Sequence, residues 1–131
     1  MNRIRINSFD IDGVINMGAF DGIYPGPNDV IITGRSFEEA KETNEMLRKK
    51  GINNPVFFNP LRFEQKTRES SGIHKGNTIA KLRSNGLLVC LHYEDDPIQI
   101  EQIQLIVPEI HVIEIKHNLV EKENVRHVNN L

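Results

Sequence analysis

The chain has 131 residues, of which 38% are hydrophobic and 26% are charged, so it is long enough for one domain with a buried core. Its formal net charge of −2 excludes a protein that coats nucleic acid through general positive charge, although a local basic site stays open. A single cysteine, Cys90, excludes an intrachain disulfide and fits a reducing, cytoplasmic location, and we expect neither a signal peptide nor a membrane-spanning stretch.

The predicted elements alternate between strands and helices. Short apolar runs predict strands over residues 2–9, 30–33, 55–58, 87–93 and 110–115. Helical spacing of apolar residues predicts helices over 36–50 and 73–85, and a third that begins at Asp96-Pro97 and stops before Pro108. The remaining stretches are a loop or short hairpin over 16–28, a polar segment over 59–71 that no pattern assigns, and a polar tail over 118–131.

This alternation is typical of an α/β fold with a mainly parallel central sheet. We expect a single domain over residues 1–117, followed by the tail over 118–131. Ligands of such sheets bind beyond the carboxyl ends of the strands, at a point where the strand order reverses. The residues that follow each strand are therefore the first candidates for a functional site.

Two carboxylates, Asp10 and Asp12, follow the first predicted strand. Residues i and i+2 of a strand point to the same side, so the two side chains should lie close together and repel each other. A divalent cation such as Mg²⁺ relieves that repulsion, and a carboxylate can also attack phosphorus as a nucleophile. The alternative is an ordinary aspartate pair in a turn or helix cap.

Two further strand ends and one helix carry candidate residues. The second strand ends in Thr33-Gly34-Arg35, the fourth ends in Glu94-Asp95-Asp96, and Lys75 lies near the start of a predicted helix. Each has an ordinary alternative: a strand-forming threonine, a helix-capping acidic cluster and a solvated lysine. The histidines lack metal-ligand spacing and are interpreted as ordinary strand or surface residues, namely His92, His111, His117 and His127, whereas His74 could face a substrate or lie at the periphery.

The order of these features resembles the haloacid dehalogenase (HAD) superfamily, and its small phosphatases in particular. The likeness covers residues 8 to 97 and rests on Asp10-Ile11-Asp12, on Ile31-Ile32-Thr33-Gly34-Arg35, on Ile73-His74-Lys75-Gly76 and on Leu91-His92-Tyr93-Glu94-Asp95-Asp96-Pro97. It implies a Rossmann-like three-layer fold. Only about twenty residues separate Asp12 from Thr33, too few for the usual flap and helix, so the likeness implies a member without a separate cap domain.

The resemblance also implies roles for individual residues. Asp10 would be the nucleophile and Asp12 the general acid/base, and acidic neighbours should raise the pKa of Asp12. Thr33 and Gly34 would bind phosphoryl oxygens, while Lys75 would steady both the nucleophile and the phosphate charge. The Mg²⁺ ion would be held by Asp10, by Asp12 through its backbone carbonyl and by Asp95, with support from Glu94, Asp96 and Arg35.

The implied function is a Mg²⁺-dependent phosphomonoester hydrolase that works through an aspartyl-phosphate. Its substrate would be a phosphorylated small molecule, a nucleotide or a nucleic-acid end. A non-catalytic phosphate-binding or regulatory protein on the same scaffold is an alternative, because a fold does not fix a function. A phospho-receiver domain is a second alternative. The missing helix leaves one face of the sheet in need of cover, so a homodimer could supply it.

Overall fold

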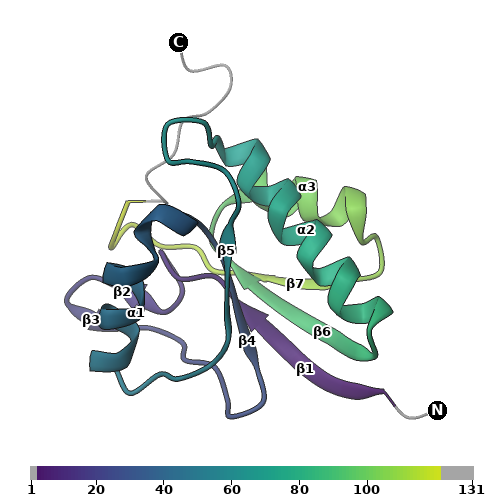
Figure 1. The fold of residues 1–131 in the computed structure, drawn as a ribbon, viewed down its shortest axis with the longest axis horizontal. Coiled ribbons are helices and arrows are strands. Elements are labelled where there is room, and N and C mark those ends of the chain that lie inside the picture. The colour runs from purple at the N-terminus through teal and green to yellow at the C-terminus, as the bar shows by residue number, and fades with distance from the viewer. Residues whose placement is uncertain (1–2, 122–131) are drawn as a thin grey trace.

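The computed structural model describes residues 3–121, which form a five-stranded sheet in which all strands run parallel (Figure 1). The strand order is β5-β4-β1-β6-β7. In chain order, the bounds of these strands are β1 Ile4–Phe9, β4 Val30–Ser36, β5 Val56–Asn59, β6 Leu87–Glu94 and β7 His111–Glu114. The α/β prediction is confirmed, and a sheet predicted to be mainly parallel is parallel throughout.

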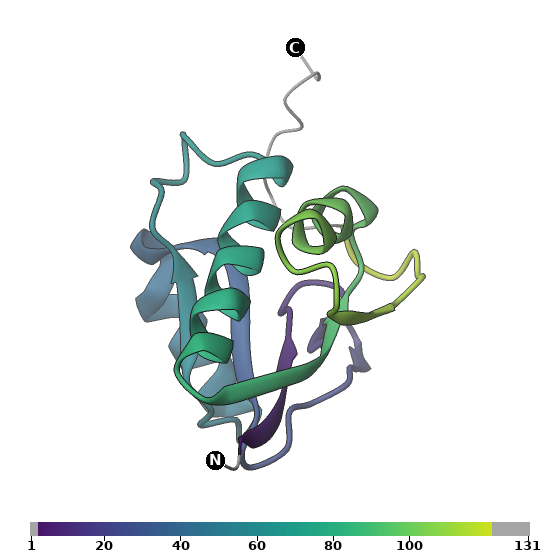
Figure 2. The same ribbon diagram turned by 90° about the vertical axis from the view of Figure 1, so that its right-hand side faces the viewer.

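Helices cover both faces of the sheet. The helical elements are η1 Phe37–Glu39, α1 Ala40–Lys49, α2 Arg68–Ser84 and α3 Pro97–Ile106. Helices α2 and α3 lie side by side on one face, and α1 lies on the other (Figures 1 and 2). Strand alternation shows the two faces directly, because Ile32 packs in the core beneath α2 and α3 whereas its neighbour Ile31 packs with Leu47 of α1. The Rossmann-like, three-layer arrangement is therefore confirmed.

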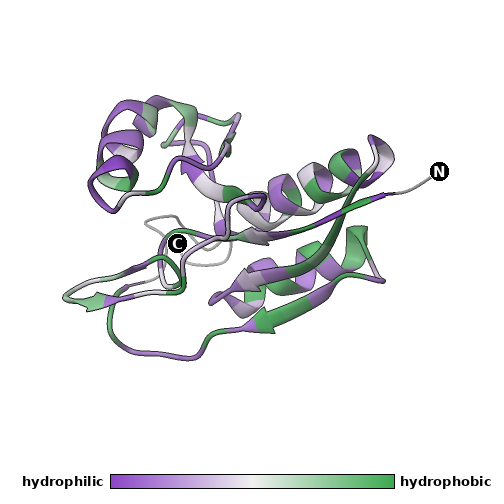
Figure 3. Ribbon diagram, turned by 90° about the horizontal axis from the view of Figure 1, so that it is seen from below, coloured by the Kyte–Doolittle hydropathy of each residue, from purple (hydrophilic) through white to green (hydrophobic). Residues whose placement is uncertain are grey.

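The helix expected to be missing between the first two sheet strands is replaced by a short hairpin. Strands β2 (Asn16–Met17) and β3 (Phe20–Asp21) pair antiparallel within the stretch expected to be a loop or hairpin. The loop before the hairpin fills the space with its own apolar side chains, since Ile11, Val14 and Ile15 are all fully buried. This loop therefore covers, together with the mostly hydrophilic α1 seen in Figure 3, the face of the sheet opposite α2 and α3.

The strand order defines one switch point. After β1 the chain builds β4 and β5 on one side, and α2 then carries it back to β6 and β7 on the other side. The crevice at a switch point lies beyond the carboxyl ends of the two strands that flank it, here β1 and β6. Receiver domains have the flavodoxin-like strand order 2-1-3-4-5, in which the second strand lies at an edge of the sheet and the third lies beside the first. The five sheet strands of this chain follow the order 3-2-1-4-5 instead, which argues against the receiver alternative.

Most element boundaries lie within one or two residues of those predicted, and two differ by more. Strand β4 continues through Gly34 to Ser36, because Ser36 pairs with Asn59 of β5 across a register shift, and this pairing outweighs the weak strand preference of glycine. Helix α2 begins at Arg68, five residues before the predicted start at residue 73. Its capping box joins Thr67 and Ser70, and a serine at the third helical position is a weaker sequence signal than the usual glutamate.

Other boundary signals hold. Ser36 and Glu39 form the expected capping box ahead of α1, and Asp96 caps α3 with Pro97 at its start. Helices α2 and α3 approach closely at Gly72, where a Cβ atom would lie 2.8 Å from the Cα of Gln99. Within residues 3–121, no helix combines the length and apolar character needed to cross a bilayer. Most of the predicted tail lies outside the described residues.

Candidate functional site

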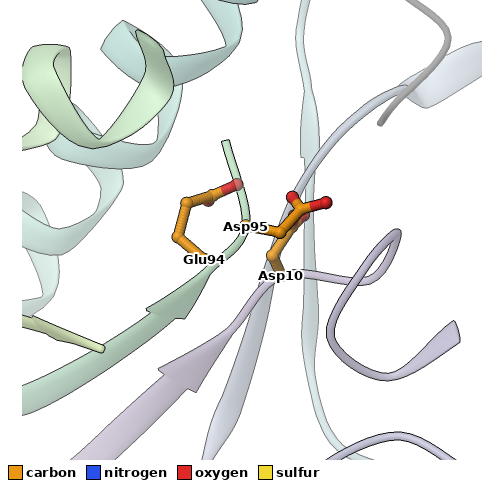
Figure 4. A group of neighbouring side chains, drawn as sticks. All are labelled: Asp10, Glu94 and Asp95. Carbon is orange, nitrogen blue, oxygen red and sulfur yellow. The ribbon is translucent and has the colours of Figure 1, made fainter. Parts of the chain in front are cut away.

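Three acidic side chains meet at the switch point. Asp10 directly follows β1, Glu94 is the last residue of β6, and Asp95 comes next (Figure 4). One carboxylate oxygen of each lies within 4.8 Å of the others, and the exposed fractions are 1% for Asp10, 0% for Glu94 and 3% for Asp95. Buried carboxylates this close repel one another, so the cluster needs compensating positive charge.

Lys75 of α2 supplies one such charge. Its fully buried ammonium lies 2.9 Å from Asp10 Oδ1 and 2.8 Å from Glu94 Oε1. The lysine thus bridges the ends of β1 and β6, as sequence reasoning predicted for its contact with Asp10. One ammonium beside three acidic groups leaves the cluster with an excess of acidic groups.

Glu94 has a second buried partner that the sequence interpretation missed. The ring of His92 lies 3.0 Å from Glu94 Oε1 through Nε2 and 2.7 Å from Ser8 Oγ through Nδ1. Burial lowers the pKa of His92 well below its usual value, so the ring is neutral, donates from Nε2 to Glu94 and accepts from Ser8. Burial raises the pKa of Glu94, against the opposing effect of the Lys75 charge.

His92 was interpreted as an ordinary strand or surface residue; it does lie on β6, but its buried hydrogen bonds to Ser8 and Glu94 were not expected. The signal available in the sequence was its place two residues before Glu94 on one strand, which puts both side chains on the same face. Ser8, His92 and Glu94 thus form a hydrogen-bonded chain of fully buried side chains, with the ring nitrogens reversed relative to those of a hydrolytic triad. We assign this chain a structural role, which is to hold Glu94 at the end of β6.

Asp12 lies apart from the acidic cluster and pairs with Arg35. The Arg35 Nε and one terminal nitrogen donate to the two Asp12 oxygens at 2.9 and 2.8 Å, and Asn16 Nδ2 adds a bond of 3.3 Å. Burial alone would raise the pKa of Asp12, but hydrogen bonding and charge from Arg35 outweigh it and lower the pKa below the usual value. The expectation that acidic neighbours raise this pKa was wrong, because Arg35 is the dominant neighbour.

The predicted phosphate-binding residues lie on the same strand as Arg35. Thr33 is fully buried, and its hydroxyl oxygen accepts a hydrogen bond of 3.0 Å from the Arg35 backbone N–H. The Gly34 carbonyl accepts from Lys66 Nζ at 3.1 Å and from Asn59 at 3.3 Å. Lys66 is almost fully buried and lies in the polar stretch that the sequence left unassigned, so its role in fixing this strand end was missed.

Asp96 faces away from the cluster toward α2 and α3. It accepts from Arg68 Nε at 2.8 Å, from the Ile98 N–H at 2.9 Å and from Gln99 at 3.1 Å. Burial would raise the pKa of Asp96, but the hydrogen bonds and charge of Arg68 lower it. These contacts give Asp96 a structural role and leave Asp95 as the acidic residue that shares the cluster with Asp10.

Gly13 and His117 close the site on the side of Asp95. His117 Nε2 lies 2.9 Å from Asp95 Oδ2. Gly13 has a φ of +87°, and a Cβ at this position would overlap Asp95 Oδ2 and lie 2.6 Å from His117 Nε2. His117 was interpreted as an ordinary strand or surface residue, and the burial of its side chain against Asp95 was not expected. His127 lies outside the described residues, and His111 is exposed on β7.

Comparison with known proteins gives no independent assignment, since the chain matches no protein-family model and no curated protein at a significant level. The site must therefore be judged on its own chemistry. Its carboxylate oxygens are the hard ligands that Mg²⁺ prefers, and one oxygen of each of the three side chains lies within 4.8 Å of the others. The Asp10 and Asp95 carboxylates thus fit a divalent cation, whereas Glu94 Oε1 is already paired with Lys75 and His92.

Proposed function

We propose that the protein is a Mg²⁺-dependent phosphomonoester hydrolase that forms an aspartyl-phosphate on Asp10. The observation that carries the proposal is the placement of the Lys75 ammonium 2.9 Å from Asp10 Oδ1, beside an acidic cluster at the switch point. A buried nucleophilic carboxylate, an ammonium and a cation site together suit the transfer of a dianionic phosphoryl group. The resemblance to HAD phosphatases supports the same roles.

The residues of the acidic cluster have different roles in this proposal. Asp10 and Asp95 would hold Mg²⁺, together with the Asp12 backbone carbonyl, while Glu94 would hold Lys75 in place. When bound, the ion would offset negative charge on the phosphoryl oxygens. The Lys75 ammonium, 2.9 Å from Asp10 Oδ1, would offset the same charge and would favour the ionised form of Asp10 that can attack.

The proposed reaction has two steps. A carboxylate oxygen of Asp10 forms a bond to phosphorus while the bond between phosphorus and the ester oxygen breaks, and Asp12 gives a proton to the departing alcohol. Water then attacks the phosphorus of the aspartyl-phosphate, its proton passes to Asp12, and the bond to Asp10 breaks to release inorganic phosphate. The hydroxyl hydrogen of Thr33 and the Gly34 N–H would bind the phosphoryl oxygens during both steps.

The ion pair between Arg35 and Asp12 affects the proton transfer in both steps. A lowered pKa makes Asp12 a weak base and leaves little of it protonated at neutral pH. The first step therefore favours esters with good leaving groups, which need little protonation. Within the proposed substrate classes of small molecules, nucleotides and nucleic-acid ends, aryl esters should react fastest.

The experiment is hydrolysis of an aryl phosphate and a panel of biological phosphomonoesters with and without Mg²⁺. We expect turnover that stops in EDTA and returns with added Mg²⁺. Asp10→Asn should lower kcat by several orders of magnitude, because an amide oxygen is a poor nucleophile. Asp21→Asn is the matched control, since Asp21 is an exposed aspartate on β3. Turnover that survives EDTA would exclude the metal role, and an active Asp10→Asn would exclude the nucleophile.

The second candidate is a non-catalytic phosphate-binding or regulatory protein, and the Arg35–Asp12 pair favours it. A carboxylate held by two bonds from arginine is poorly placed to move protons. The two candidates separate when inorganic phosphate binding and turnover are measured on one preparation. Binding without turnover of any ester would favour the second candidate. The cytoplasmic location and the homodimer stay predictions.

Analytical ultracentrifugation tests the homodimer, because it measures the mass of the protein in solution.

A further inference from the structure

The segment that follows β7 crosses the candidate site. The Ile115 N–H donates to the Glu94 carbonyl at 2.8 Å, which ties the start of this segment to the end of β6. Farther along, the surroundings of Gly18 in the β2–β3 hairpin include Val120 Cγ1, at 3.1 Å from a Cβ built on the glycine. In Figure 1 this last coloured part of the chain reaches from β7 toward β2. The segment of residues 115–121 thus passes beside Asp95.

Within this segment, the side chain of His117 contacts the acidic cluster. Its side chain is 4% exposed, and its Nε2 lies 2.9 Å from Asp95 Oδ2. The Leu119 backbone N–H lies 3.2 Å from the other ring nitrogen, Nδ1, and donates to it. A nitrogen that accepts carries no proton, so this bond assigns the neutral tautomer with its hydrogen on Nε2. His117 therefore donates to Asp95.

The local backbone is shaped to allow this contact. Gly13 lies against both partners, and only the absence of a side chain there lets the Asp95 carboxylate and the His117 ring approach together. The φ of Gly13 is +87°, a left-handed backbone conformation that glycine adopts without the steric cost of a side chain. Two distant segments, the loop after β1 and the segment after β7, thus jointly fix the position of one carboxylate.

We propose that His117 is a positioning residue that orients Asp95 for a divalent cation. The inference rests on the proposed metal site and extends it to a residue from outside the HAD-like motifs. A hydrogen bond on one carboxylate oxygen fixes the rotation of the group and so the direction in which the other oxygen points. Groups that hold metal ligands in this way typically change metal affinity about 10–100-fold when they are removed.

The test compares two amide variants by direct binding of Mn²⁺, followed by electron paramagnetic resonance of the free ion. His117→Gln places its amide nitrogen near the position of Nε2 and keeps the donor. His117→Asn carries the same amide on a shorter side chain, which ends near Nδ1 and cannot reach Asp95. We expect affinity within about threefold of wild type for Gln and a loss of about tenfold or more for Asn. His111→Asn is the matched control on the exposed face of β7 and should bind Mn²⁺ as wild type does.

Each outcome decides the inference. Equal Mn²⁺ affinity in the Asn variant and wild type would overturn it, as would equal losses in the Gln and Asn variants, because they would indicate a steric rather than a donor role. A wild-type protein that binds no Mn²⁺ would overturn it together with the metal site. A protein that binds Mn²⁺ but hydrolyses no ester would remove the proposed reaction only, and the Gln–Asn comparison would still decide the role of His117.

Discussion

Arg35 and Asp12 form a two-bond ion pair, with the Arg35 Nε 2.9 Å from Asp12 Oδ2 and a terminal nitrogen 2.8 Å from Oδ1. Both side chains are largely buried, so water screens the pair only weakly. The pair separates the two aspartates that the sequence places one residue apart: Asp10 belongs to the acidic cluster, and Asp12 belongs to Arg35. The chemistry of the site depends on how firmly this pair holds.

Arg35→Met should shift the pH dependence of turnover. Without the guanidinium, burial dominates and the pKa of Asp12 rises. A higher pKa keeps the acid protonated to higher pH, so the alkaline limb of kcat for an alkyl phosphate should move upward. Arg83→Met is the control, because Arg83 pairs with the exposed Glu109 away from the site. An unchanged limb would mean that Asp12 is not the acid.

Asp12→Asn should affect substrates according to their leaving groups. General acid catalysis contributes about 10²–10⁴-fold, so alkyl phosphates should lose kcat by that order. Aryl phosphates should lose much less, because their leaving group departs without a proton. The measurement is a plot of kcat against leaving-group pKa for both proteins. Equal losses across the series would point to a structural effect of breaking the Arg35 pair.

Lys75→Met should lower the free energy of unfolding, and the loss should be smaller at lower pH. Removing one partner of a buried ion pair costs about 3–5 kcal/mol, here because Asp10 and Glu94 lose their shared cation. The charge of Lys75 lowers the pKa of Glu94, so its loss raises that pKa further in the folded variant, and a raised folded pKa means that stability is lost as pH rises. The deficit against wild type should therefore be larger at pH 7 than at pH 5 in urea unfolding. Lys81→Met, at an exposed position of α2, is the control.

Gly13→Ala should lower stability more than Gly51→Ala does. Both glycines have a positive φ, +87° and +77°, which an alanine adopts at a penalty of about 1–2 kcal/mol. A Cβ at residue 51 meets nothing within 4 Å, whereas one at residue 13 collides with Asp95. The difference between the two variants in free energy of unfolding isolates the collision. The Gly13→Ala variant should also bind Mn²⁺ more weakly than the Gly51→Ala variant. Similar free energies of unfolding for the two variants would contradict the predicted collision.

His74→Gln should make stability less dependent on pH between about 4 and 6.5. Burial lowers the pKa of His74 from 6.5 to about 4, so in this range the unfolded chain binds a proton that the folded chain does not. Stability from this group is complete above pH 6.5 and is lost as pH falls, by up to about 1.4 kcal/mol per pH unit. Glutamine keeps a donor for the Phe57 carbonyl but does not titrate. Urea unfolding at several pH values measures the slope, and an equal slope in the two proteins would contradict the assignment.

The local parts of the fold could be predicted because their causes are local. The Ser36 capping box and the Asp96-Pro97 helix start depend on residues within one helical turn, and both are present. The gathering of Asp10 and Asp95 followed from strand ends, since parallel strands bring their carboxyl ends to one edge, whereas the Lys75 contact with Asp10 was implied by the resemblance to HAD proteins. The start of α2 was missed because serine replaces the usual glutamate in its capping box.

The sequence by itself determined the alternation of strands and helices and the strand ends at which acidic residues would gather, because periodicity and order along the chain encode both. Only the tertiary structure decided the partners of those residues. Arg35 reaches Asp12 across 23 residues and His117 reaches Asp95 across 22, and neither spacing has a periodic signature. Such contacts depend on where the hairpin and the segment after β7 pack on the sheet. Packing of this kind is a property of the whole folded chain, so it fixes the pKa of Asp12 and the closure of the site in a way that no single stretch records.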